Sequence, residues 1–357
     1  MKARFLALAA LVLGMVSCQQ DFDGVAPVGG EVDFQLTVAA PELGATRADG
    51  DERNGHDSAF GAIDFLSEAD WANYDLRYIL EVYDANDDGT GEPIYLERLV
   101  NCLDKYAPTT FSLRLVPDRD YKFVVFADYV AEGNAEKVEP ADKLAIADLY
   151  YNTADLRNIS TITSNPSWNA MNEVRDAYFV SENVHITTTL QKTLTLTRPF
   201  AKLRVIATDL DYIAGYSAPG YVEVTYKNEP IYKSFNAVNG ELNTAAMAGE
   251  ELTYGFEVNK NIPYNAGYDA YSTNQTLFAD YFFGTEDGKV LFTLDVADES
   301  YAMPQIVFNT NIPVQRNYLT TIQGNILTDG NNVEVKVEDA FVNGGEWNPE
   351  TDEYDVE

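Results

Sequence analysis

One stretch near the start of the chain decides how the rest is interpreted, and it reads Val32-Asp33-Phe34-Gln35-Leu36-Thr37-Val38. Apolar and polar residues alternate along it, which places four apolar side chains on one face: Val32, Phe34, Leu36 and Val38. A period of two with β-branched and aromatic residues is typical of a strand with one buried face. Burying each such side chain contributes about 1.5–3 kcal/mol before entropy is counted. We therefore expect this strand to matter to the sheet that it joins.

Two interpretations of this strand follow from the residues. In the first, it is the ordinary opening strand of a β-sandwich, and Arg47 downstream is a solvated loop residue. In the second, Arg47 is a protease site in the small, polar context Ala45-Thr46-Arg47-Ala48, and the strand is made to be removed. Its loss would leave an apolar groove and unpaired backbone groups, which a strand from another molecule can fill. The residues alone leave both interpretations open.

The first residues have the pattern of an export signal. A basic start, Met1-Lys2-Ala3-Arg4, precedes an apolar run over 5–16 that is too short to span a bilayer as a stable helix. Ser17-Cys18 closes this run as in the lipobox of bacterial lipoproteins. We expect cleavage after residue 17 and acylation (palmitate) of Cys18, because each buried CH₂ of an acyl chain adds about 0.8 kcal/mol of membrane affinity. The acidic segment 19–23 resembles a surface-export signal, so we expect an outer-membrane lipoprotein on the cell surface.

Composition restricts the possible chemistry. The 357 residues carry a formal net charge of −33, which argues against nucleic acid as a partner. With Cys18 lipidated, Cys102 is the one cysteine left, and its apolar context predicts a buried structural residue. The histidines, His56 and His185, lack the spacing of metal ligands. Because the sequence contains neither a nucleophile motif nor a glycine-rich phosphate loop, we expect no enzyme and no cofactor.

A weak calcium candidate lies at Asp84-Ala85-Asn86-Asp87-Asp88-Gly89. Oxygen ligands at alternate positions, here Asp84, Asn86 and Asp88, wrap a hard cation, and glycine permits the sharp turn. Such a loop also needs a bidentate acid six residues after the glycine, where this chain has Tyr95. The same residue types are the usual ones of a turn between strands, and we favour the turn.

Short strand patterns with turn signals fill most of the chain and predict an all-β fold of two sandwiches. The region 131–185 is an excursion with short helices expected over 141–149 and near 171–178. Arg198-Pro199-Phe200 interrupts a strand run, because proline cannot donate to a ladder, and we place the domain boundary there. The expected parts are the signal 1–17, a propeptide 18–47, and β-sandwiches over 48–198 and 199–357. Residues 221–227 and 230–235 are expected to form a hairpin.

Three segments carry a resemblance to a known family. They are Arg175-Asp176-Ala177-Tyr178-Phe179, Arg198-Pro199-Phe200-Ala201-Lys202-Leu203-Arg204-Val205, and Asn311-Ile312-Pro313-Val314-Gln315-Arg316-Asn317-Tyr318-Leu319-Thr320-Thr321-Ile322-Gln323-Gly324-Asn325. The second resembles the entry to the second domain of fimbrillins, the pilin-like surface lipoproteins that form type V pili. The third resembles their late Ile-Pro-x-x-Arg-Asn signature. With the lipobox and Thr46-Arg47-Ala48, the resemblance covers most of the chain.

The resemblance implies two tandem transthyretin-like β-sandwich domains, with short helical insertions in the first. It also implies that a trypsin-like surface protease cuts between Arg47 and Ala48. The strand with Val32, Phe34, Leu36 and Val38 is then replaced by a strand from a neighbouring pilin subunit. The chain is accordingly expected to be a pilus subunit that serves adhesion.

The end of the chain departs from what a stalk subunit needs. After Val333-Glu334-Val335-Lys336-Val337 the tail is acidic and sparse in apolar residues, which makes it a poor donor strand. This favours a tip or accessory subunit. The alternative is a surface lipoprotein that never polymerises and that binds a glycan, a host protein or a bacterial surface ligand.

Overall fold

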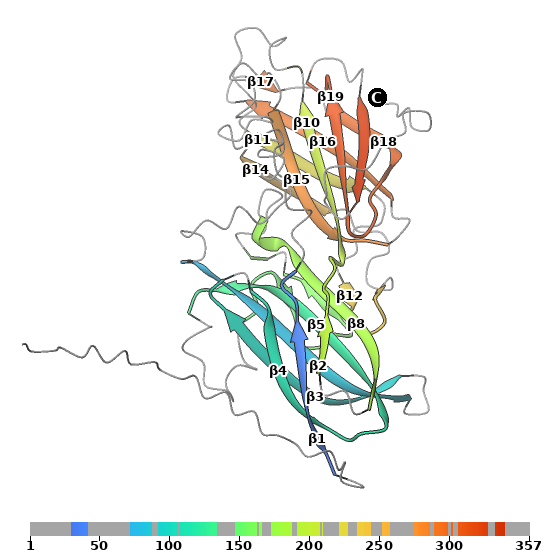
Figure 1. Ribbon diagram of the computed structural model, residues 1–357. Helices are drawn as coiled ribbons and strands as arrows, with labels where there is room; N and C mark the ends of the chain where they lie inside the picture. Colours follow the sequence, from blue (N-terminus) through green and yellow to red (C-terminus); the bar gives the residue numbers. More distant parts are fainter. Residues whose placement is uncertain are drawn as a thin grey trace, which may run out of the picture.

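The chain is all-β, and Figure 1 shows its computed structural model. The structure describes residues 30–41, 72–87, 92–105, 107–133, 147–162, 164–165, 173–187, 191–207, 209, 221–227, 234–243, 252–257, 275–285, 289–298, 301–302, 306–327 and 333–339. Within these, helix is limited to a single 3-10 turn, η4 (Glu173–Arg175). The helix expected over 141–149 lies mostly outside the described residues, and residues 147–149 are not helical. The all-β prediction is confirmed.

Two sheets face each other in the lower body of Figure 1. One has the order β4 (Thr109–Leu115), β1 (Val32–Val38), β9 (Gln191–Leu194). The other has the order β3 (Pro93–Leu103), β2 (Tyr74–Asp87), β5 (Arg119–Ala131), β8 (Ala177–Ile186). Their facing side chains form one apolar core, to which Phe34 contributes from β1, Leu80 from β2 and Phe123 from β5.

The upper body repeats this arrangement with strands from the second half of the chain (Figure 1). One sheet has the order β15 (Gln275–Phe283), β10 (Phe200–Ala207), β19 (Tyr318–Gly324), β20 (Glu334–Asp339). The other has the order β14 (Leu252–Glu257), β11 (Tyr221–Lys227), β16 (Lys289–Asp298), β17 (Tyr301–Ala302), with β18 (Ile306–Pro313) also paired to β16. In both bodies the first strand lies between an antiparallel and a parallel neighbour, so the two sandwiches share a topology.

A small third sheet covers the outer face of the β3-β2-β5-β8 sheet. Its order is β13 (Glu241–Leu242), β12 (Ser234–Asn236), β7 (Ile159–Thr161), β6 (Tyr151–Asn152). Phe235 of β12 and Ile159 of β7 share a core with Val124 and Phe126 of β5. The lower body therefore has three layers, and β12 lies beside β8 in Figure 1.

The third layer overturns one expectation. Residues 230–235 were predicted to form a hairpin with 221–227, but β12 pairs with β7, and β11 pairs with β14 and β16. The excursion between β11 and β14 thus returns to the first half of the chain. Sequence proximity favoured the hairpin, whereas Phe235 gains a buried aromatic environment beside Phe179, at 4.7 Å between ring centroids.

The three segments that resemble fimbrillins meet where the two bodies join. Arg175 forms an ion pair of 2.7 Å with Asp280 of β15, and both side chains are 1% exposed. Arg198, just before β10, forms an ion pair of 2.8 Å with Asp176. The backbone N–H of Asn317 donates to the carbonyl of Phe200 at 2.7 Å. These contacts connect the end of the first body to the start of the second.

We predict that Arg175→Met destabilises the whole chain. The substitution leaves the buried Asp280 carboxylate without its charged partner, which costs about 3–5 kcal/mol. Urea unfolding should show a loss of that size. The control is Lys192→Met, which breaks the partly exposed pair of Lys192 with Glu182 and should cost about 1 kcal/mol or less. Equal losses in the two variants would contradict a special role for the junction pair.

Candidate functional site

The candidate site is the seat that β1 occupies in the β4-β1-β9 sheet. β1 runs antiparallel to β4, from Val32 opposite Leu115 to Val38 opposite Thr109. It runs parallel to β9 from Gln35 onward, and the N–H of Ala39 donates to the carbonyl of Leu194 at 2.9 Å. Because β1 is the middle strand, its removal would break two ladders and leave β4 and β9 with unpaired facing edges.

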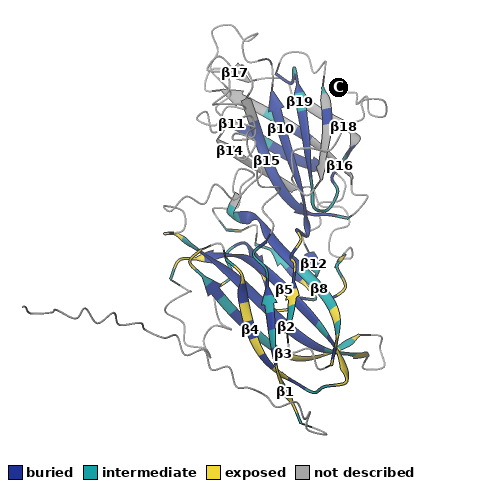
Figure 2. Ribbon diagram, in the orientation of Figure 1, coloured by how far each residue is buried: buried dark blue, intermediate teal, exposed yellow. Residues whose placement is uncertain are grey.

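The inner face of β1 is buried as predicted. Phe34, Leu36 and Val38 are each 1% exposed or less, and Val32 is half-buried against the same core. The Phe34 ring stacks on Phe123 of β5, with 5.8 Å between centroids and 15° between planes. Figure 2 shows the alternation of buried and exposed positions along β4 and the near-continuous burial of β5, which forms the floor beneath β1. Without β1, this floor would be an apolar groove.

The outer face of β1 forms a polar ladder with β4. The Gln35 amide donates to the Ser112 hydroxyl at 3.1 Å and accepts from it at 3.2 Å. The hydroxyls of Thr37 and Thr110 are 3.2 Å apart. The strand is therefore held in register on both faces.

A histidine lies at one end of the seat. The turn after β4 contains Asp118, whose N–H donates to the carbonyl of Ile186 at 2.7 Å. His185 of β8 contacts Asp120 at 2.8 Å through Nδ1 and Asp118 at 3.4 Å through Nε2. The hydrogen bond to Asp120 raises the pKa of His185 above its ordinary value of 6.5, and the charges of both carboxylates act in the same direction.

The predicted lipidation, cleavage and calcium residues lie partly outside and partly within the described residues. Cys18, Arg47, Ala48 and Asp88 lie outside the described residues. Asp84 and Asn86 lie in β2, which continues through Asp87 past the predicted start of the turn, with irregular pairing to β3 between Asp84 and Asp87. Asp84 Oδ1 accepts from the backbone N–H of Asn86 at 3.0 Å and from its side-chain amide at 2.6 Å. Asp84 also pairs with Arg119 at 3.5 Å. Over the ranges that the structure describes, there is no cluster of three or more His, Cys, Asp or Glu residues suited to a metal ion.

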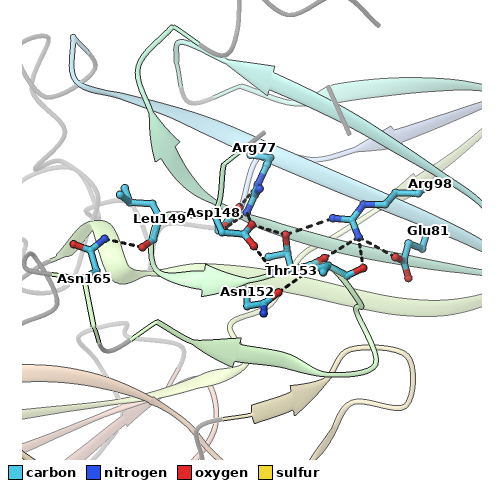
Figure 3. Close-up of polar contacts among 10 residues, drawn as sticks. Arg77, Glu81, Arg98, Asp148, Leu149, Asn152, Thr153 and Asn165 are labelled. Carbon is cyan, nitrogen blue, oxygen red and sulfur yellow. Dashed lines mark hydrogen bonds and ion pairs between the residues drawn. The ribbon is translucent and has the colours of Figure 1, made fainter. Parts of the chain in front are cut away.

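Sequence reasoning missed a buried charged network between β2, β3 and the segment 147–157 (Figure 3). Arg77 of β2 pairs with Asp128 at 2.7 Å and with Asp148 at 2.9 Å. Asp148 accepts from the backbone N–H of Thr153 at 2.9 Å, and Arg98 of β3 donates to the Thr153 carbonyl at 2.7 Å. No local pattern marks these residues, since Arg77 is 51 residues from Asp128 and Arg98 is 55 residues from Thr153.

The network is structural in character. Arg98 also pairs with Glu81 at 3.2 Å, and the Tyr83 hydroxyl donates to the same carboxylate. Burial raises the pKa of Glu81, while these two partners oppose the rise. Each carboxylate of the network is thus already engaged by a cation or a donor. The contacts hold the segment that carries β6 against the central sheet.

The comparison that decides the family is a match of residues 26–357 to a family of unknown function, DUF6562. This chain belongs to the DUF6562 family. No curated protein matches it. No helix in the described part of this DUF6562 protein is long and apolar enough to cross a membrane.

The solved structures that are similar to this DUF6562 chain include two fimbrial proteins. One is a fimbrial assembly protein from Parabacteroides distasonis, with 14% identity, a TM-score of 0.39, and coverage of 87% of this chain and 96% of that one. The other is the tip fimbrial protein Mfa3 from Porphyromonas gingivalis with a C-terminal truncation, with 13% identity, a TM-score of 0.38, and coverage of 86% and 99%.

We predict that His185 titrates above pH 6.5. Its raised pKa means that the contact with Asp120 contributes stability below the unfolded pKa, and that this contribution is lost as the pH rises through the folded pKa. NMR titration checks this, with His56→Gln to assign the two histidine signals. Asp120→Asn should move the His185 pKa down toward 6.5. An unchanged pKa in Asp120→Asn would contradict the contact.

Proposed function

We propose that this DUF6562 chain is a fimbrillin-like pilus subunit, structural or accessory, that serves adhesion. It is exported as a lipoprotein anchored through Cys18 in the outer membrane. A trypsin-like protease cuts between Arg47 and Ala48, and a strand from another pilin subunit then replaces β1. The mature protein stands on the cell surface as part of a fimbrium.

The observation that carries the proposal is the way in which β1 is attached. Arg47 lies between the end of β1 at Val38 and the start of β2 at Tyr74. A cut after Arg47 therefore leaves β1 held by noncovalent contacts, which in the described residues are its two ladders, its apolar face and its side-chain contacts with β4. Those contacts are the kind that another strand of the same pattern can make, since backbone groups supply the hydrogen bonds and alternate side chains fill the core.

The third layer supports the proposal, because it keeps the central sheet packed on one face when β1 is lost. On the face of β5 that points away from β1, Val124 and Phe126 pack with Phe235 of β12 and Tyr151 of β6. Removing β1 uncovers one face of the central sheet and leaves the other face buried. The sheet therefore keeps a core of its own while the seat is empty.

A tip or accessory position fits the acidic residues after β20 better than a stalk position. β20 is the last described strand and pairs with β19 at the edge of its sheet. The sequence after it is rich in acids and offers few apolar residues at alternate positions. A subunit that accepts a strand but donates poorly would end a pilus.

One observation bears on the alternative of a non-polymerising surface lipoprotein that binds a glycan or a host protein. Ile94, Tyr95 and Leu96 are 42%, 48% and 47% exposed, and they are consecutive on the edge strand β3. Exposed apolar residues on an edge strand are typical of interaction sites. This surface is compatible with either function, because a pilus subunit also needs an adhesive face.

The test is the fate of the chain on intact cells. We expect wild-type protein to begin at Ala48 and to run in SDS-resistant complexes of high mass when samples are not boiled. Arg47→Ala should remain uncut there and monomeric. Arg53→Ala is the matched control, because it removes a nearby arginine and should behave as wild type. Wild-type protein that begins at Ala48 and stays monomeric would exclude strand exchange and favour the binding lipoprotein.

A further inference from the structure

Alternation by itself does not define how a strand sits in the seat of β1. A shift by one residue turns the apolar side chains outward, so alternation excludes odd shifts. A shift by two residues keeps apolar side chains inside and polar ones outside. The register of an incoming strand must therefore depend on features that differ from one position of the seat to the next.

On the inner face, that feature is an aromatic ring. Phe34 is the one aromatic residue of β1, and its ring is fully buried. It stacks on Phe123, which in turn stacks on Tyr121 with 6.5 Å between centroids and 9° between planes. The Tyr121 hydroxyl accepts from the N–H of Val116 at 3.0 Å, which holds this column of rings in place. A shift by two would put Val32 or Leu36 opposite Phe123 and leave a void.

On the outer face, the polar contacts of β1 with its neighbours favour the same register. Gln35 stands between Ser112 of β4 and Gln191 of β9, and Thr37 stands between Thr110 and Thr193. The amide of Gln35 therefore lies opposite a hydroxyl residue on β4 and an amide residue on β9, whereas Thr37 lies opposite a threonine on each side. At the end of the seat, Arg114 pairs with Glu31 at 3.4 Å. Amide, hydroxyl and acidic groups fall at defined distances from the ring.

We propose that this seat selects its partner strand by an aromatic ring at the Phe34 position, with an amide and a hydroxyl at the outward positions of Gln35 and Thr37. The partner is an extended segment of another molecule with the order apolar, polar, aromatic, amide, aliphatic, hydroxyl, aliphatic. This inference rests on the proposed strand exchange, and it specifies which sequence pattern an incoming strand must have. The recognising group on this chain is the Phe123–Tyr121 ring column.

The last described strand of this chain does not meet the requirement. β20 has the sequence Glu334-Val335-Lys336-Val337-Glu338-Asp339, with valine at alternate positions and no aromatic residue. Charged residues occupy the positions on either side of each valine. A peptide of this strand is therefore the natural comparison, since it has the alternation without the ring.

The experiment uses the full chain with a sequence-specific protease site in place of residues 44–49. After the cut, β1 is held noncovalently, and a fluorescent peptide of residues 30–41 is added in excess. Its incorporation is followed by fluorescence anisotropy. We expect the wild-type peptide to exchange in and to stay bound.

Peptide variants test the selection without altering the folded chain. Phe34→Leu should bind about tenfold more weakly, because it keeps an apolar side chain but loses the ring. Phe34→Ala should bind about a hundredfold more weakly, because it leaves a cavity against Phe123. Ala40→Ser, beyond the end of β1 at Val38, is the control and should bind like wild type. The peptide of residues 332–341, which covers β20, should bind no better than Phe34→Ala.

A change in the seat completes the test. In the Phe123→Leu variant of the chain, the ratio of the affinities for the wild-type peptide and the Phe34→Leu peptide should fall several-fold, because the stacking partner of Phe34 is missing. If wild-type peptide exchanges but Phe34→Leu and the β20 peptide bind equally well, the selection is wrong and strand exchange stands. If wild-type peptide never enters the cut chain, the proposed function itself fails.

Discussion

The structure depends on the sheet β3-β2-β5-β8, whose two inner strands, β2 and β5, are buried on both faces. β5 shows this most directly: Phe123 and Val125 pack toward β1, while Val124 and Phe126 pack toward the third layer. A strand buried on both faces loses the alternation of polar and apolar residues, and residues 123–130 of β5 are all buried. Every other layer of the first body attaches to this sheet, so its integrity does not depend on β1 alone.

The junction of the two bodies combines apolar and ionic contacts that do different things. Rings from both halves of the chain, including Tyr151, Phe200 and Phe283, pack with centroids 4.7–5.9 Å apart and supply apolar burial. The Arg175–Asp280 pair adds little net stability, because burial raises the pKa of Asp280 and desolvation offsets the attraction. Its geometry, however, joins β15 to the end of the first body at a defined position, since Arg175 also donates to the Tyr281 carbonyl at 2.9 Å. The apolar contacts favour association, and the ion pairs define its orientation.

The same division appears at the seat of β1. Apolar burial gives the seat its affinity for any strand with a hydrophobic face, which by itself would tolerate shifts by two residues. The Phe34–Phe123 stack and the Gln35–Ser112 and Thr37–Thr110 contacts add the discrimination. A site that accepts strands and yet distinguishes among them needs both kinds of contact.

Local patterns were enough to predict the strand over 32–38, the face that it buries, the buried Cys102 and the all-β character, because the alternation of side chains is a property of consecutive residues. They were not enough for the third layer, where Phe235 pairs with Ile159, or for the network of Arg77 with Asp128, because nothing between such distant residues records that they meet. The sequence by itself determined that residues 32–38 form a strand with an apolar side. Only the tertiary structure decided that this strand is the middle one of its sheet, because both of its ladders are made by residues from 109–115 and 191–194 that come together on folding.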